Sequence, residues 1–268
     1  MPLFSKISAP SDDFFGDDYT KKVTCKIKTK AGPVGVTSET ERKTKGSTSL
    51  LSKLSFKWAA GSGFSIDKLQ MKPDGSHVME TSLTGVAPGL KFTFKGDDAQ
   101  NGDLGVEYTK GAIGMTAEMD IIELKQVAAS LAASKGDLAF GGSATYKIAG
   151  GSLDKYSVGA SYSSGPLFAS VMSDKLSSVD LGLKYKVNSD LVVGTSSTHS
   201  ASAPLGAMTA GASFNAPFGI VKGKATSDGV LSAVLVKEVA KKVTITPAVQ
   251  VKASDFANAT WGLGVTMG

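Results

Sequence analysis

The sequence has little of what soluble enzymes and helical membrane proteins are built from. Its one cysteine, Cys25, excludes an internal disulfide and leaves no cysteine-based metal site. No run approaches the roughly 20 apolar residues of a membrane-spanning helix. The two histidines, His77 and His199, have no cysteine or acidic neighbours at metal-ligand spacing. Phosphate-loop, dinucleotide-binding and serine-nucleophile motifs are also missing, so we expect no enzyme, no metal and no cofactor.

What the chain does contain favours strands. It has 31 glycines and is rich in serine and threonine, a composition that suits short strands and turns. In residues 21–30, KKVTCKIKTK, Val23, Cys25 and Ile27 fall on one face of an extended strand and most of the lysines on the other. Similar segments of about 8–12 residues, the length of a tilted strand that crosses a bilayer, lie between turn signals. We predict an all-β fold, a transmembrane barrel of about 19 strands.

The width of such a barrel decides which face points inward. About 19 strands enclose a lumen too wide for side chains to fill, so the polar face should meet water and the apolar face lipid. The strand phase then places 13 lysines and seven acids in the lumen. The lysines are Lys22, Lys26, Lys28, Lys30, Lys43, Lys53, Lys57, Lys91, Lys95, Lys147, Lys184, Lys186 and Lys252, and the acids are Glu39, Glu41, Glu80, Glu107, Glu118, Asp120 and Asp180.

Residues 1–20 differ from residues 21–268, which form the predicted barrel. Leu3, Phe4 and Ile7 share one helical face, so we predict two short amphipathic helical pieces, separated at Pro10 and with Ser11 as the second N-cap. A disordered tail is the alternative. Docked in the lumen, this segment would line the pore with Lys6, Asp12, Asp13, Asp17 and Asp18. The lumen would then hold 14 positive and 11 negative groups, which predicts a mild anion preference that changes if the segment moves.

Three stretches fit the barrel pattern poorly. Leu124–Ala133 has a helical composition, and its position between two good strands makes us expect a strand. Pro247 inside a strand predicts a bulge or a weakly paired position. Lys68 is in phase with the apolar Phe64 and Ile66, so either the register slips there or the lysine extends to the membrane interface.

At this point the chain resembles the mitochondrial porins, the voltage-dependent anion channels of the outer mitochondrial membrane. The resemblance covers nearly the whole chain. It rests on Asp13-Phe14-Phe15 and Tyr19 before a first strand ending in Lys28-Thr29-Lys30, on Gly89-Leu90-Lys91, and on a closing strand that ends Trp261-Gly262-Leu263-Gly264-Val265-Thr266-Met267. The combination of these motifs with the length and strand number is more specific than any one motif.

This resemblance implies 19 strands, a number known for these channels, with parallel pairing of the first and last strands. It implies passage of ATP, ADP, phosphate and small organic anions, and nucleotide contacts at Lys6, Lys21 and Lys22, to which we add Lys91. It also implies an insertion signal formed by Thr260, Gly262, Val265 and Met267. Tyr19-Thr20-Lys21-Lys22 stands where the family has a glycine-rich hinge, and no lipid-facing glutamate is evident near Lys68.

We therefore expect a voltage-dependent, weakly anion-selective diffusion channel of the outer mitochondrial membrane. The N-terminus lacks the features of a secretory signal peptide, so we expect synthesis in the cytosol and later insertion. The partners considered are membrane lipid, permeating nucleotides and small anions, a homo-oligomer and cytosolic kinases, but not nucleic acid. Two alternatives stay open: a polypeptide import pore of the same membrane, and a soluble β-barrel binding module.

Overall fold

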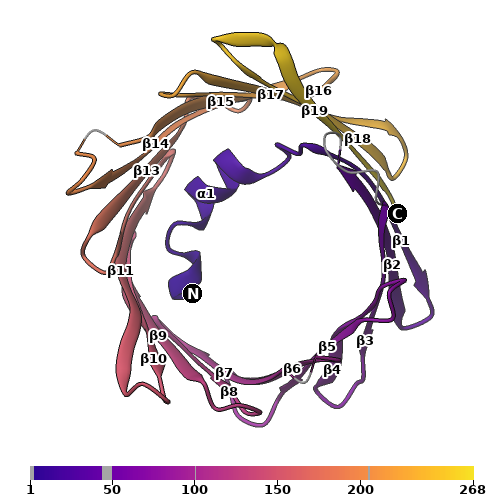
Figure 1. The fold of residues 1–268 in the computed structure, drawn as a ribbon, viewed down its shortest axis with the longest axis vertical. Helices are drawn as coiled ribbons and strands as arrows, with labels where there is room; N and C mark the ends of the chain where they lie inside the picture. Colours follow the sequence, from indigo (N-terminus) through magenta and orange to yellow (C-terminus); the bar gives the residue numbers. More distant parts are fainter. Residues whose placement is uncertain (1–2, 44–49, 100, 205) are drawn as a thin grey trace.

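The computed structural model describes residues 3–43, 50–99, 101–204 and 206–268 and shows a barrel with a short helical segment inside it (Figure 1). The N-terminal segment contains the 3-10 helix η1 (Phe4–Lys6) and the helix α1 (Ala9–Gly16). The strands are β1 (Lys22–Ala31), β2 (Val34–Lys43), β3 (Leu50–Ala59), β4 (Phe64–Met71), β5 (His77–Thr84), β6 (Leu90–Asp97), β7 (Gly102–Lys110), β8 (Ile113–Asp120), β9 (Gln126–Lys135), β10 (Leu138–Lys147), β11 (Ser152–Ser164), β12 (Leu167–Asp174), β13 (Ser178–Lys186), β14 (Leu191–Ser200), β15 (Met208–Ala216), β16 (Gly219–Thr226), β17 (Val230–Ala240), β18 (Val243–Lys252) and β19 (Asp255–Met267).

Each strand pairs with its neighbour in sequence in antiparallel fashion, which makes a single 19-stranded sheet. Because direction alternates along such a meander, the first and the nineteenth strands run the same way. They close the barrel as a parallel pair, with Val23 opposite Leu263 and Ile27 opposite Met267. The all-β fold, the 19 strands and the parallel closure are thus confirmed. Turn glycines such as Gly111 (φ 57°) and Gly136 (φ 59°) adopt the left-handed conformation that side chains disfavour.

The barrel has almost no apolar interior. Among the described residues, six apolar side chains are buried, and three of them, Phe4, Ile7 and Ala132, form one small cluster where η1 touches the wall. The large apolar side chains of β13 face outward instead, with Leu181 43% and Leu183 41% exposed. A soluble barrel would bury these side chains in its centre. Their outward exposure rules out the soluble binding module.

The N-terminal segment has the two predicted helical pieces, but the boundary between them was predicted wrongly. Helix α1 begins at Ala9 with Ser8 as its N-cap residue, so Pro10 lies within the first turn. Proline fits this position because its missing N–H would have no intrahelical partner there. Ser11 is therefore not the N-cap, and its side chain is buried against the wall, 2% exposed.

A β-bulge in β4 determines whether Lys68 faces the lipid or the lumen. Ile66 pairs with Thr81 and Lys68 pairs with Glu80, so Asp67 is an extra residue in the ladder. The bulge returns Lys68 to the inner face, and its Nζ lies 3.2 Å from Glu80 Oε1. The register slips at this position, and the lysine does not face lipid.

The other two irregular stretches are strands. β9 begins at Gln126, so most of the helix-like segment is paired with β8 and β10, as expected from its position. Pro247 pairs with Leu263 of β19. Toward β17, Val234 pairs with Ala248 and Lys237 pairs with Ile245, and the pairing is interrupted at Pro247 between them. This agrees with a weakly paired position, because proline has no N–H to donate.

Candidate functional site

The contacts of α1 identify the inner face of the wall. A Cβ atom added to Gly182 would clash with Ser11 Oγ, and one added to Gly194 would lie 2.9 Å from the Phe14 ring. Since α1 lies inside the barrel (Figure 1), Gly182 and Gly194 must face the lumen. Residues directly opposite each other in neighbouring strands point to the same side of the sheet. The strand pairing therefore identifies, strand by strand, which residues of the barrel face the lumen.

The register then places the candidate pore-lining lysines on the inner face. They are Lys22, Lys26, Lys28, Lys30, Lys53, Lys57, Lys91, Lys95, Lys147, Lys184, Lys186 and Lys252. The side chain of Lys43 lies outside the described residues. Lys6 is exposed at the end of η1, and Asp12 and Asp13 are exposed on α1. The wall is thus lined by cations along β1, β3 and β6 and again along β13.

Further inner lysines are absent from the sequence-based set: Lys68, Lys155, Lys222 and Lys224. Lys222 and Lys224 were missed because the residue between them, Gly223, has no apolar side chain that would indicate the outer face. Their spacing of two residues, which places both on one face of a strand, was the available signal in the sequence. Inner acids were also missed, among them Asp67, Asp103, Asp174 and Glu238. The count of 14 positive and 11 negative groups is therefore incomplete, and its additions carry both signs.

Helix α1 packs on the wall through small residues of β12 to β15. Phe14 and Phe15 meet edge to face, with ring centroids 4.9 Å apart. Phe14 lies over Gly194, and Phe15 lies over Gly211, where an added Cβ would come within 3.2 Å of its ring. The missing side chains at these glycines make room for the two rings, so the helix can approach the wall closely.

Two lysines of β16 hold the end of the helical segment. Lys222 Nζ lies 2.6 Å from Asp18 Oδ2, and Lys224 Nζ donates to the carbonyl oxygen of Phe15. Lys224 Nζ also lies 4.0 Å from the centre of the Tyr19 ring. Burial raises the pKa of Tyr19, and the Asp18 carboxylate raises it further, so this phenol stays neutral at physiological pH. Of the four helical aspartates, Asp18 makes the expected contact with a lumen lysine, whereas Asp12 accepts a hydrogen bond from Ser8.

Several wall lysines are neutralised by acids on the adjacent strand or on the next strand but one. The nitrogen–oxygen distances are 3.1 Å for Lys22–Glu41, 3.5 Å for Lys26–Glu39, 3.6 Å for Lys91–Asp67, 2.9 Å for Lys95–Glu118 and 2.8 Å for Lys147–Asp154. Such half-exposed pairs contribute little to stability, typically about 0–1 kcal/mol each. They do cancel the local field, so an anion in the lumen is attracted mainly by the lysines outside these pairs.

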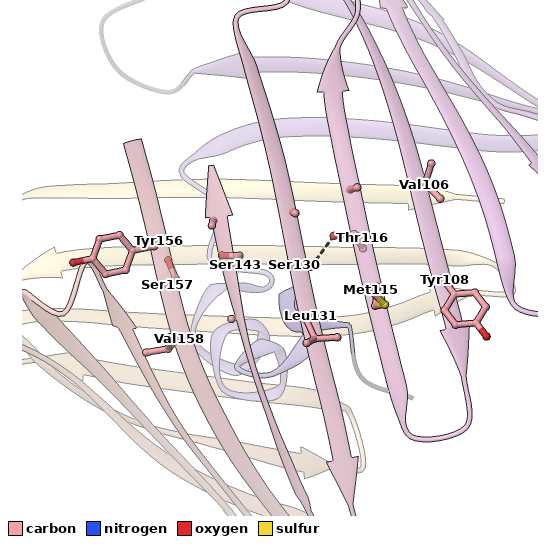
Figure 2. A pocket seen from close by; sticks show the side chains of 14 residues that line it. Val106, Tyr108, Met115, Thr116, Ser130, Leu131, Ser143, Tyr156, Ser157 and Val158 are labelled. Atoms are coloured by element: carbon pink, nitrogen blue, oxygen red, sulfur yellow. Dashed lines mark hydrogen bonds between the residues drawn. The ribbon is translucent and has the colours of Figure 1, made fainter. Parts of the chain in front are cut away.

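A concavity on the outer surface must be distinguished from the lumen. It spans β7 to β11 and is floored by small residues such as Ala117 and Ala144, between Tyr108 and Tyr156 (Figure 2). The hydrogen bond between Thr116 and Ser130, 2.6 Å long, lies on the inner face of the same strands. The concavity is apolar and belongs to the outer surface of the wall.

The described residues offer no catalytic or metal-binding arrangement. No group of three or more His, Cys, Asp or Glu side chains among them could hold a metal ion. The imidazole of His199 contacts the carbonyl oxygen of Pro204 and the hydroxyl of Ser197. In this part of the chain, no helix has the length and apolarity needed to cross a membrane.

An apolar outer surface, a polar lumen and a closed ring of strands define a β-barrel diffusion channel of the porin class. The chain belongs to the eukaryotic porin family, because the model of that family matches residues 1–263. It is a multi-pass outer-membrane β-barrel, and the family and fold point to a channel rather than an enzyme.

One solved porin structure supports the fold. A mutant of the Rh. blastica porin is 12% identical, with a TM-score of 0.52 over 83% of this chain and 92% of that one. OmpT, an outer membrane protein of Vibrio cholerae, is 11% identical with a TM-score of 0.39 over 83% of this chain and 88% of that one. A comparison with curated protein sequences returned no match for the chain.

Proposed function

We propose that this porin is a voltage-dependent, weakly anion-selective channel of the outer mitochondrial membrane. It would pass ATP, ADP, phosphate, small organic anions and salt ions. The observation that supports this most directly is the inner wall of lysines, several of which lie outside the ion pairs described above. Fixed positive charge along a water-filled path raises the local concentration of anions.

The voltage dependence rests on α1. The N-terminal segment carries Asp12 and Asp13 on α1 and Asp17 and Asp18 directly after it, and it lies inside the lumen, where a transmembrane potential acts on its charge. Its contacts with β16 are one ion pair, one hydrogen bond and one cation–ring contact, and its helix packs on small residues of β12 to β15, so a field that moves the segment must break both sets of contacts. Movement of these carboxylates would change both the width and the charge of the pore.

The remaining assignments belong to the same proposal. Lys6, Lys21, Lys22 and Lys91 are the nucleotide contacts, although Lys22 and Lys91 also pair with acids in this structure. Thr260, Gly262, Val265 and Met267 lie on β19 as the insertion signal. The partners would be membrane lipid, a second copy of the chain and cytosolic kinases.

Single-channel current in a planar bilayer under a KCl gradient tests the proposal. We expect a reversal potential on the chloride side, and smaller, less anion-selective conductance states at tens of millivolts. A cation preference would contradict the charge assignment and point to the polypeptide import pore. Voltage-independent current would contradict the role of α1.

A further inference from the structure

We propose that a pocket between α1 and the wall of β12 to β14 binds aliphatic diamines and polyamines. The pocket has a volume of about 310 Å³, at the lower end of the usual range of small-molecule sites, about 300–1,000 Å³. Its lining includes the carboxylates of Asp12 on α1, Asp174 on β12 and Asp180 on β13. The site adds cation binding to the proposed anion channel, and only its effect on gating rests on the proposed function.

The strand register places two of these carboxylates side by side on the inner face. Asp180 pairs with Met172, and Asp174 pairs with Ser178, so the two aspartates are diagonal neighbours about 7–8 Å apart. Asp12 lies in the first turn of α1, on the opposite side of the pocket. Among the described residues, no three such groups come close enough together to hold a metal ion. Carboxylates spaced in this way suit separate ammonium groups on one flexible chain.

The negative charge of the pocket is not cancelled by the protein. Among the described residues, no lysine, arginine or histidine nitrogen lies within 4.0 Å of the Asp12, Asp174 or Asp180 carboxylate. Each carboxylate accepts a hydrogen bond from a neighbouring hydroxyl group, as Asp180 Oδ1 does from Thr198 Oγ1 at 2.5 Å. A hydroxyl group is neutral, so the field of the three carboxylates stays available to attract a cation.

Two buried hydroxyl groups provide an observation that is independent of these charges. Ser11 of α1 is 2% exposed and Ser170 of β12 is 8% exposed, and neither side chain makes a hydrogen bond within the described part of the chain. Both hydroxyl groups lie over Gly182, where an added Cβ would clash with Ser11 Oγ and lie 2.7 Å from Ser170 Oγ.

The position of these two hydroxyl groups indicates a ligand. Fully enclosed side-chain oxygens of the described residues all have partners, so the oxygens of Ser11 and Ser170 keep access to the pocket that they line. Buried polar groups are normally hydrogen-bonded, and an unpartnered one in a native structure requires an explanation. Each oxygen can accept a hydrogen bond from an ammonium group. A ligand with several N–H donors would therefore satisfy both the hydroxyl groups and the carboxylates.

An aliphatic diamine matches this set of groups. An ammonium group has three donors, enough for one carboxylate and one hydroxyl group, and its bonds to carboxylates are roughly twice as strong as bonds between neutral groups. The apolar stem between the two ammonium groups can lie against Met172, and Gly182 leaves room for it. An amine with one charge would engage one carboxylate, whereas a diamine can bridge α1 and the wall.

Such a bridge would couple the ligand to the position of the helix. Asp12 belongs to α1, whereas Asp174 and Asp180 belong to the wall, so the complete site exists only while α1 is docked. A ligand that binds one of two states stabilises that state by mass action. We therefore expect the amine to slow proteolysis of the N-terminal segment and to move channel closure to higher voltages.

The test titrates putrescine, spermidine and the monoamine butylamine into the folded full-length chain in detergent by calorimetry. The variant Asp174→Asn/Asp180→Asn is compared with Asp103→Asn/Glu107→Gln, which removes the same charge from the inner face of β7, outside the pocket. We expect putrescine and spermidine to bind, and butylamine to bind roughly tenfold more weakly. The first variant should weaken putrescine binding roughly tenfold, and the control variant less than about twofold.

A second variant tests the buried hydroxyl groups without changing any charge. Ser170→Ala should weaken putrescine binding roughly threefold. An unchanged affinity would overturn the placement of the amine over Gly182. Equal weakening in the two double variants would overturn the site, because only the total charge of the lumen would then matter. Butylamine binding as tight as that of putrescine would show that the ligand does not bridge two groups.

Bilayer recordings and limited proteolysis with putrescine separate this site from the proposed function. Protection of the N-terminal segment by putrescine in a channel without voltage dependence would refute the proposed gating and support the site. Voltage-dependent closure in a channel that binds no putrescine would refute the site and leave the proposed function intact. A shift of the closure voltage that is lost in Asp174→Asn/Asp180→Asn and kept in the control variant would support both.

Discussion

The wall of β12 to β15 and the wall of β1 to β4 have the same alternating strand pattern but different residues on their inner faces. In the wall of β12 to β15, the inward positions that face α1 are small, as at Ser170, Gly182 and Gly194. In the wall of β1 to β4, the inward positions face water and carry lysines such as Lys28 and Lys57. The comparison teaches that the inward positions under α1 are small enough for the helix to pack on them, whereas inward lysines are found where the wall faces water.

The largest effect should come from changing strand phase in each wall. Deleting Leu183 from the regular strand β13 should turn Lys184 toward lipid, which costs about 2–4 kcal/mol near the bilayer midplane. Deleting Asp67 from β4 removes only the bulge residue, so Lys68 stays inward and the loss should stay within about 1 kcal/mol. Urea unfolding in lipid vesicles measures both free energies. Equal losses would show that the bulge does not hold the register.

The next prediction concerns whether packing of α1 requires small residues at the inward positions of β12 to β15. The Cβ atom of a valine at position 182 would clash with Ser11 Oγ. We expect Gly182→Val to weaken docking of α1 by about 1–3 kcal/mol, which limited proteolysis of the N-terminal segment would report as faster cleavage. Gly35→Val is the matched control, since its added Cβ meets ordinary contacts. Faster cleavage in both variants would contradict the comparison.

A smaller effect is expected from the ion pair that holds the helical segment. Lys222→Gln removes the contact with Asp18, whose side chain is 35% exposed, and should cost up to about 1 kcal/mol. The midpoint voltage of channel closure should therefore shift toward lower potentials, whereas Lys252→Gln, also on the inner wall, should leave it unchanged. An identical shift in the two variants would show that the midpoint voltage depends on the total charge of the inner wall and not on the contact with Asp18.

The smallest effect is on selectivity. Lys57→Glu reverses a charge of the open wall and should lower the ratio of chloride to potassium permeability roughly twofold, about 0.4 kcal/mol. Lys22→Glu should change it less, because Lys22 already lies 3.1 Å from Glu41. Reversal potentials under a KCl gradient measure both ratios. A larger change at Lys22 would refute the distinction between paired and unpaired lysines.

The sequence alone determined the strands and their two faces. Alternation of period two in segments such as β1 and β13 depends only on neighbouring residues, because successive side chains of a strand point to opposite sides. The number of strands then required a wide lumen with water inside. The inner lysines of the regular strands could be identified in this way, apart from Lys222 and Lys224, between which the outer face carries only Gly223.

The tertiary structure decided what depends on partners distant in sequence. The phase of Lys68 is set by its pairing with Glu80, and the helix start at Ala9 is accompanied by burial of Ser11 on Gly182. Which lysines are neutralised depends likewise on cross-strand neighbours such as Glu41 and Glu118. Local patterns specify which face of a strand is polar, but only closure of the barrel brings together the charges, the helix and the cavity on that face.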